Sequence, residues 1–148
     1  PRSTLFPYTT LFRSDVRNNI IAEIDELSFR QLIRILIDNA IKYSGDSRTI
    51  KVSLIGTNDH FTLSVEDHGI GIEKKDLPKI FDRFYRADES RTKQTGGYGL
   101  GLSIAKAIVD AHDGHITVKT KPGEGTKFII RMPYVHKADE SKTSANTL

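Results

Sequence analysis

The sequence predicts an α/β domain of the α+β kind, a two-layer sandwich in which a mostly antiparallel, mixed sheet carries helices on one face. Four segments alternate apolar and polar residues as strands do, and two others repeat apolar residues at helical steps of three and four. The apolar residues of the four strands share one parity, so we expect helices to cover only that face. That face consists of Ile50, Val52, Leu54, Phe61, Leu63, Val65, Ile116, Val118, Phe128, Ile130 and Met132.

The predicted elements follow one another in blocks. They are a short strand at 20–25, a helix at 28–44, a hairpin of strands at 49–56 and 60–67, a short helix at 77–86, a helix at about 99–111 and a hairpin of strands at 115–121 and 126–133. Asp25 or Ser28 is the expected cap of the first long helix, which ends near Gly45. Pro78 suits the first turn of the short helix.

Length and composition are those of one folded domain. The 148 residues are 37% hydrophobic and 28% charged, which argues against disorder and collagen. No apolar run approaches the roughly 20 residues of a membrane span. The formal charge of +3 is too mild and scattered for a nucleic-acid surface, and we expect no nucleic-acid partner. No cysteine is present, and the five histidines lack metal-ligand spacing.

The two ends are predicted to lie outside the domain, which we place at 15–135. Residues 4–14, TLFPYTTLFRS, resemble the translation of a sequencing-adapter oligonucleotide, so we interpret 1–14 as a non-native segment. The alternative is a real amphipathic strand, because Leu5, Phe6 and Phe12 are apolar. Residues 136–148 are polar and without periodicity, which predicts a disordered tail.

Asp67 ends a strand on the apolar face, so its carboxylate points toward the helices. A carboxylate placed there needs hydrogen-bond donors from the protein or from a ligand. Gly69 and Gly71 follow it and allow a flat ligand to approach the backbone. We interpret Asp67 as an acceptor for an exocyclic amine such as that of adenine. The alternative is a turn in which Asp67 bonds its own backbone.

A glycine-rich stretch, QTGGYGLGL at 94–102, opens the second long helix. It is not a P-loop, because no GK[ST] follows, and the spacing of Gly97, Gly99 and Gly101 misses GxGxxG by one residue. It follows a polar loop that contains Arg91. A helix N-terminus beside a basic loop suits a polyphosphate.

One sector of the first long helix carries Ile35, Asn39, Lys42 and Tyr43. Asn39 offers an oxygen to a hard cation, Lys42 a positive charge and Tyr43 a ring for stacking. The alternative is an ordinary solvated helix face.

Four motifs in the order IDNAIKYS, DHGIGI, IFDRFYR and TGGYGLGL resemble those of the catalytic ATP-binding domain of bacterial sensor histidine kinases. They are similar to that family's N box, first glycine box, F box and second glycine box, and GEGT at 123–126 is similar to a further glycine motif. The resemblance covers about 15–133. It implies the Bergerat fold of the GHKL group, shared with gyrase, Hsp90 and MutL ATPases.

The resemblance also implies a site for ATP and Mg²⁺. The implied roles are Mg²⁺ ligation by Asn39, phosphate contact by Lys42, stacking by Tyr43 and binding of the adenine amine by Asp67. The implied adenine pocket includes Gly69, Gly71 and Ile72, and the implied phosphate cradle includes Gly97, Gly99, Leu100 and Gly101. The implied γ-phosphate contacts are Arg83 and Arg91, and the implied lid anchors are Phe81, Phe84 and Tyr85.

One position departs from the family pattern. Many members carry a second Asn four residues before Asn39, and hydrolysing relatives carry a Glu there, whereas this chain has Ile35. An isoleucine neither coordinates Mg²⁺ nor activates water. Phosphoryl transfer, which depends mostly on positioning and charge neutralisation, tolerates the change better.

The function that the resemblance implies is that of a protein histidine kinase fragment. It would donate the ATP γ-phosphoryl group to a histidine on a separate dimerisation domain of the same parent protein, with a response regulator as an indirect partner. We expect the fragment to be monomeric and cytoplasmic, with the parent anchored in the cell membrane. The alternatives are a GHKL-type ATPase, an anti-sigma-like serine kinase or a non-catalytic binding module.

Overall fold

A five-stranded mixed sheet forms one layer of the protein. The computed structural model describes residues 11–17, 20–47, 49–85 and 101–135. The strands are β1 (Leu11–Arg17), β2 (Thr49–Gly56), β3 (His60–Asp67), β4 (His115–Lys121) and β5 (Gly125–Pro133). Their order in the sheet is β1-β2-β3-β5-β4, and only the β1–β2 pair is parallel. The predicted mixed, mostly antiparallel sheet is confirmed.

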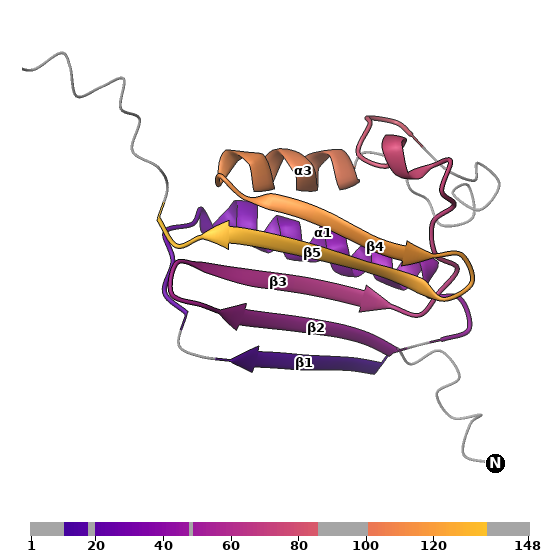
Figure 1. Ribbon diagram of the computed structural model, residues 1–148, viewed down its shortest axis with the longest axis horizontal. Helices are drawn as coiled ribbons and strands as arrows, with labels where there is room; N and C mark the ends of the chain where they lie inside the picture. The colour runs from indigo at the N-terminus through magenta and orange to yellow at the C-terminus, as the bar shows by residue number, and fades with distance from the viewer. Residues whose placement is uncertain (1–10, 18–19, 48, 86–100, 136–148) are drawn as a thin grey trace, which may run out of the picture.

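Two helices form the second layer, on one face of the sheet (Figure 1). They are α1 (Glu26–Tyr43) and α3 (Gly101–Ala111), and a short 3₁₀ helix, η2 (Leu77–Lys79), lies between β3 and α3 in the chain. Asp25 is the N-cap of α1, since its Oδ2 accepts the backbone N–H of Ser28 at 3.0 Å. Gly45, with a φ of 59°, follows the end of α1.

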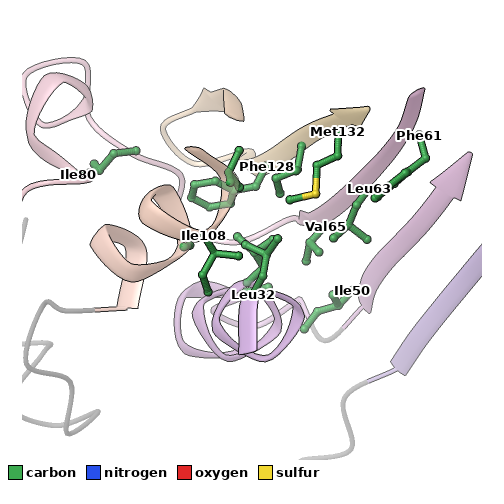
Figure 2. Packing of buried hydrophobic residues seen from close by; sticks show 14 residues of the cluster. Leu32, Ile50, Phe61, Leu63, Val65, Ile80, Ile108, Phe128 and Met132 are labelled. Carbon is green, nitrogen blue, oxygen red and sulfur yellow. The ribbon is translucent and has the colours of Figure 1, made fainter. Parts of the chain in front are cut away.

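The core lies between these layers (Figure 2). Leu32 and Leu36 of α1 and Val109 of α3 are fully buried against the inward side chains of the sheet. The phenyl rings of Phe61 and Phe29 meet edge to face, with their centroids 5.9 Å apart. The apolar face read from strand parity therefore forms the core, and its members are all buried or packed against it.

Two expected elements are wrong. Residues 20–25 form no strand. Ile20, Ala22 and Ile24 pack on the core. Among the described residues, this segment makes one backbone hydrogen bond to a distant part of the chain, from Glu23 N–H to Tyr134 O, rather than the repeated hydrogen bonds of a paired strand. The helix expected at 77–86 is reduced to η2, and Phe84 has a φ of 64°, which an α-helix excludes.

Strand β1 crosses the predicted boundary between residues 14 and 15. It pairs with β2 in parallel over its whole length. Phe12 and Val16 pair with the inward-facing Ile50 and Leu54, so they lie on the side of the helices, yet they are 53% and 66% exposed at this edge of the sheet. A strand at 11–17 is compatible with both interpretations of residues 1–14, as a non-native segment and as a real amphipathic strand.

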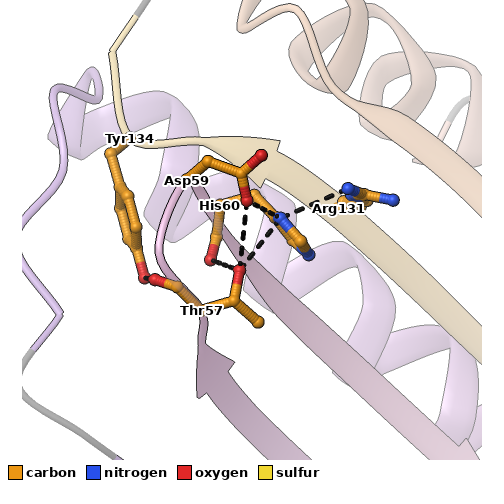
Figure 3. Close-up of polar contacts among 5 residues, drawn as sticks. All are labelled: Thr57, Asp59, His60, Arg131 and Tyr134. Carbon is orange, nitrogen blue, oxygen red and sulfur yellow. Dashed lines mark hydrogen bonds and ion pairs between the residues drawn. The ribbon is translucent and has the colours of Figure 1, made fainter.

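A polar cluster closes the end of the sheet at the β2–β3 turn (Figure 3). His60 Nδ1 lies 2.6 Å from Asp59 Oδ1, 3.0 Å from Thr57 Oγ1 and 3.3 Å from Arg131 Nη2. The hydrogen bond from His60 lowers the pKa of Asp59. Tyr134 donates its hydroxyl to Thr57 O at 2.7 Å, which joins the end of β5 to the turn.

None of the described helices is long and apolar enough to cross a membrane.

His112 connects the two helices. Its side chain is buried, its Nδ1 lies 2.8 Å from Ile108 O, and its Nε2 accepts the backbone N–H of Asp25 at 3.2 Å. The imidazole therefore joins the C-terminal end of α3 to the N-cap of α1, as a structural residue.

Replacement of His112 by alanine should lower the free energy of unfolding by about 1–3 kcal/mol, because it removes a buried side chain together with its hydrogen bonds to Ile108 O and to Asp25 N–H. Chemical denaturation measures this change. His115→Ala is the matched control, since that side chain is exposed, and it should change stability by less than about 0.5 kcal/mol. Equal losses in the two variants would contradict the role of His112.

Candidate functional site

A cavity of about 390 Å³ opens at the C-terminal end of β3. Its lining residues are Asn39, Tyr43, Asp67, Ile70, Gly71, Ile72, Glu73, Lys75, Asp76, Ile80, Tyr85, Leu102 and Thr126. They come from the last turns of α1, the end of β3, the following segment, the start of α3 and the start of β5. Figure 1 shows that the end of β3, the β4–β5 turn and the segment after β3 lie at the same end of the sheet.

The carboxylate of Asp67 is a buried polar group of this cavity, with 3% of the residue exposed. Its Oδ1 accepts the backbone N–H of Gly69 at 2.9 Å, which is the turn bond that we considered as the alternative. Burial raises the pKa of Asp67 above its ordinary value of 3.8, and backbone N–H groups of Gly69 and Thr126 oppose that rise. The carboxylate of Asp67 therefore both accepts the hydrogen bond of its own turn and lines the cavity. The fold holds it in a poorly solvated position.

The segment after Asp67 is pressed between two other pieces of main chain. A Cβ on Gly69 would lie 1.6 Å from the carbonyl oxygen of Tyr43, and one on Gly71 would lie 2.3 Å from that of Lys121. Gly71 also has a φ of 70°. Only glycine allows the backbone to pass this close to both α1 and the β4–β5 turn.

The far wall of the cavity contains a second buried carboxylate, that of Asp76, which accepts the hydroxyl hydrogen of Tyr85. This hydrogen bond raises the pKa of Tyr85. Lys79 Nζ lies 5.9 Å from the centroid of the same ring. The hydrogen bond thereby joins Tyr85, which follows η2, to Asp76, which precedes it. Ile80 adds an apolar side chain to the wall of the cavity.

The structure brings most of the described candidates together. Asn39, Tyr43, Asp67, Gly71 and Ile72 line the cavity. Gly69 lies next to Asp67, and Gly101 precedes the lining residue Leu102. Lys42 and Arg83 are exposed and do not line it. Arg91, Gly97, Gly99 and Leu100 lie outside the described residues.

The expected lid anchors separate into three environments. Phe81 packs against the core, Tyr85 bonds Asp76, and Phe84 is 69% exposed.

Sequence reasoning missed several lining residues. Thr126 lies in the GEGT motif but received no role, and the register of β3 against β5 pairs it across the sheet with Asp67. These strands belong to different hairpins, so the pairing depends on the strand order of the sheet, which local sequence patterns do not give. Asp76 carries no local signal either, because its contact with Tyr85 depends on how the irregular segment folds back.

The comparisons with known proteins identify the family of this chain. Residues 24–136 match the family model described as histidine kinase-, DNA gyrase B- and HSP90-like ATPase. The chain belongs to this family, and within it to the catalytic domains of two-component sensor histidine kinases. Membership of the family implies ATP binding.

The relatives are longer than the part of them that this chain matches. The chain is 50% identical over 116 residues to the sensor histidine kinase YkoH of Bacillus subtilis, which covers 78% of this chain and 25% of YkoH. It is 46% identical over 122 residues to the sensor protein CiaH of Streptococcus pneumoniae, covering 82% and 28%. The chain thus spans about a quarter of these relatives.

A solved structure is similar to this chain over most of the length of both proteins. The catalytic domain of the histidine kinase ThkA has a TM-score of 0.73 at 27% identity, covering 90% of this chain and 88% of that one. The predicted Bergerat fold is confirmed.

Substitution of Gly69 by alanine should destabilise the domain, by about 1–3 kcal/mol or more, because the new Cβ collides with main-chain atoms that cannot move aside. Gly101→Ala is the control, since its Cβ would meet Ile35 Cγ2 at an ordinary 3.4 Å and alanine favours the helix. Denaturant titration compares the two. A Gly69→Ala variant as stable as the unchanged protein would refute the close packing described above.

Proposed function

We propose that this domain binds Mg-ATP and donates the γ-phosphoryl group to a histidine on a dimerisation domain of the same parent protein. A response regulator is the proposed indirect partner. The observation that carries the proposal is the buried carboxylate of Asp67 at an open cavity, because a poorly solvated acceptor beside closely packed backbone suits the amine of adenine.

The walls of the cavity suit a flat purine. Ile70, Ile72, Ile80 and Leu102 supply apolar surface, and Tyr43 supplies a ring at the end of α1. Asp67 then fixes the orientation of the base through one directional hydrogen bond. The phosphates would extend toward the start of α3, whose N-terminal N–H groups favour negative charge.

The residues present fit a Mg²⁺ ion that arrives with the nucleotide. Asn39 lines the cavity and its side chain carries an amide oxygen, and Mg²⁺ in nucleotide sites commonly takes one or two protein ligands and completes its shell with phosphates and water. When bound, the ion neutralises phosphate charge. No cluster of three or more His, Cys, Asp or Glu suited to a metal occurs among the described residues.

Lys42 and Arg83 are proposed as phosphate contacts from the rim. Both are exposed, and both carry side chains long enough to reach a ligand that projects out of the cavity. Ile35 lies beside Gly101 at the junction of α1 and α3 and offers no base to activate water. This favours phosphoryl transfer over a hydrolytic ATPase.

We further propose 15–135 as the functional domain, with 1–14 and 136–148 outside it. The family model matches 24–136, which lies inside this domain except for residue 136, whereas residues 11–14 belong to β1 and pair with β2. A cytoplasmic location within a membrane-anchored parent is proposed from the sensor kinases to which the chain is similar.

Titration of the whole chain with a non-hydrolysable ATP analogue and Mg²⁺ should give saturable binding. Asp67→Asn should weaken it by about tenfold or more, because the variant removes the charged acceptor. Asp82→Asn, at an exposed carboxylate that does not line the cavity, should leave binding unchanged. Absence of saturable binding, or equal affinity in Asp67→Asn, would sink the proposal.

Binding should also weaken as the pH falls through the mildly acidic range. The ionised form of Asp67 accepts the amine, and its raised pKa means that protonation begins at a higher pH than for an ordinary aspartate. The ratio of the affinities of the unchanged chain and Asp67→Asn isolates this group from the titration of the phosphates. A ratio that does not change with pH contradicts the assignment.

Steady-state hydrolysis separates the proposed kinase from a GHKL-type ATPase. With isoleucine at position 35, the isolated chain should release phosphate from ATP no faster than the Asp67→Asn variant does. Sustained turnover by the unchanged chain, abolished in that variant, would favour the ATPase.

A further inference from the structure

Thr120 occupies an inward position near the end of β4, directly across the sheet from Thr126. It is half-buried and does not line the cavity itself. Its hydroxyl nevertheless hydrogen bonds the backbone of Ile72 and the side chain of Thr126, which both line the cavity.

Three hydrogen bonds meet at this hydroxyl. Thr120 Oγ1 accepts the backbone N–H of Ile72 at 2.9 Å, donates to the carbonyl oxygen of Gly125 at 3.0 Å and lies 2.9 Å from Thr126 Oγ1. A hydroxyl has one hydrogen and two acceptor sites. With the hydrogen on Gly125 O, the Ile72 N–H and the Thr126 hydroxyl fill both acceptor sites, so all of its capacity is used.

Besides the bond from Gly69 N–H to Asp67 Oδ1, main-chain hydrogen bonds hold the segment after Asp67 in place. Ile70 N–H donates to Tyr43 O at 3.1 Å, and Gly123 N–H donates to Ile70 O at 2.8 Å. Within the described ranges, Thr120 is the one side chain of β4 or β5 that hydrogen bonds the backbone of this segment. The Thr120 hydroxyl therefore links the backbone of Ile72 to the side chain of Thr126, and both of these residues line the cavity.

We propose that Thr120 is a positioning residue for base recognition, which rests on the proposed binding of ATP. It holds the Ile72 backbone at a fixed distance from β5, and Asp67 pairs with Thr126 in the same ladder. The width of the part of the cavity in which the base would meet Asp67 thus depends on the Thr120 hydroxyl. Loss of this hydroxyl releases the wall that contains Ile72 without removing any group that would touch the nucleotide.

The test uses the whole chain with substitutions at two threonines of β4. Thr120→Val keeps the shape of the side chain but removes the hydroxyl, Thr120→Ser keeps the hydroxyl, and Thr117→Val makes the same change on the exposed face of the strand. Each variant is titrated with non-hydrolysable analogues of ATP and of ITP, whose hypoxanthine base lacks the exocyclic amine. Thermal unfolding is followed in parallel.

Thr120→Val should bind the ATP analogue about tenfold more weakly, and its preference for adenine over hypoxanthine should fall. Thr120→Ser and Thr117→Val should retain both the affinity and the preference of the unchanged chain. Rescue by serine together with a lost preference is a result that a purely structural role does not produce, since general loosening weakens both nucleotides equally.

Three results would overturn the role of Thr120. They are unchanged binding in Thr120→Val, an equal loss for both nucleotides, and a serine variant as weak as the valine variant. If Thr120→Val does not fold, Thr120→Ser decides, because a lost preference there refutes the role of the hydroxyl and a retained one supports it. No saturable binding by the unchanged chain would overturn the proposed function itself, and with it this role.

Discussion

The close passage of the main chain after β3 between α1 and the β4–β5 turn is the constraint on which the site depends. Gly69 lies against the carbonyl of Tyr43, and Gly71 lies against that of Lys121. These contacts join the end of the helical layer to the end of the sheet. Since packed backbone deforms little, the segment that begins at Asp67 has one available path, and the cavity forms beside it.

That path explains why a carboxylate is tolerated in a poorly solvated place. Asp67 is almost fully buried, and its raised pKa reports the unfavourable free energy of keeping a charge there. The backbone N–H groups of Gly69 and Thr126 compensate for part of it. A ligand that donates a hydrogen bond completes the compensation, so the same burial that disfavours the charge makes the carboxylate selective for a donor.

Much of the fold was predictable from particular residues. Strand parity identified the apolar face, Gly45 marked the end of α1, and Asp25 was one of two expected caps at its start, because alternation and capping are local properties. The same alternation failed at residues 20–25, where Ile20, Ala22 and Ile24 pack on the core without a neighbouring ladder. Periodicity reports which side chains face inward, and it does not report whether a backbone partner is present.

The sequence by itself determined the two long helices, the four strands after the first helix, the buried face, the membership of the ATPase family and the central candidate, Asp67. Only the tertiary structure decided which side chains surround that carboxylate. It placed Thr126 and the Asp76–Tyr85 hydrogen bond at the cavity, gave Thr120 its contact with Ile72 and left Lys42 exposed. Those contacts join residues distant in the chain or fix the path of an irregular segment, so they arise from packing that no local pattern encodes.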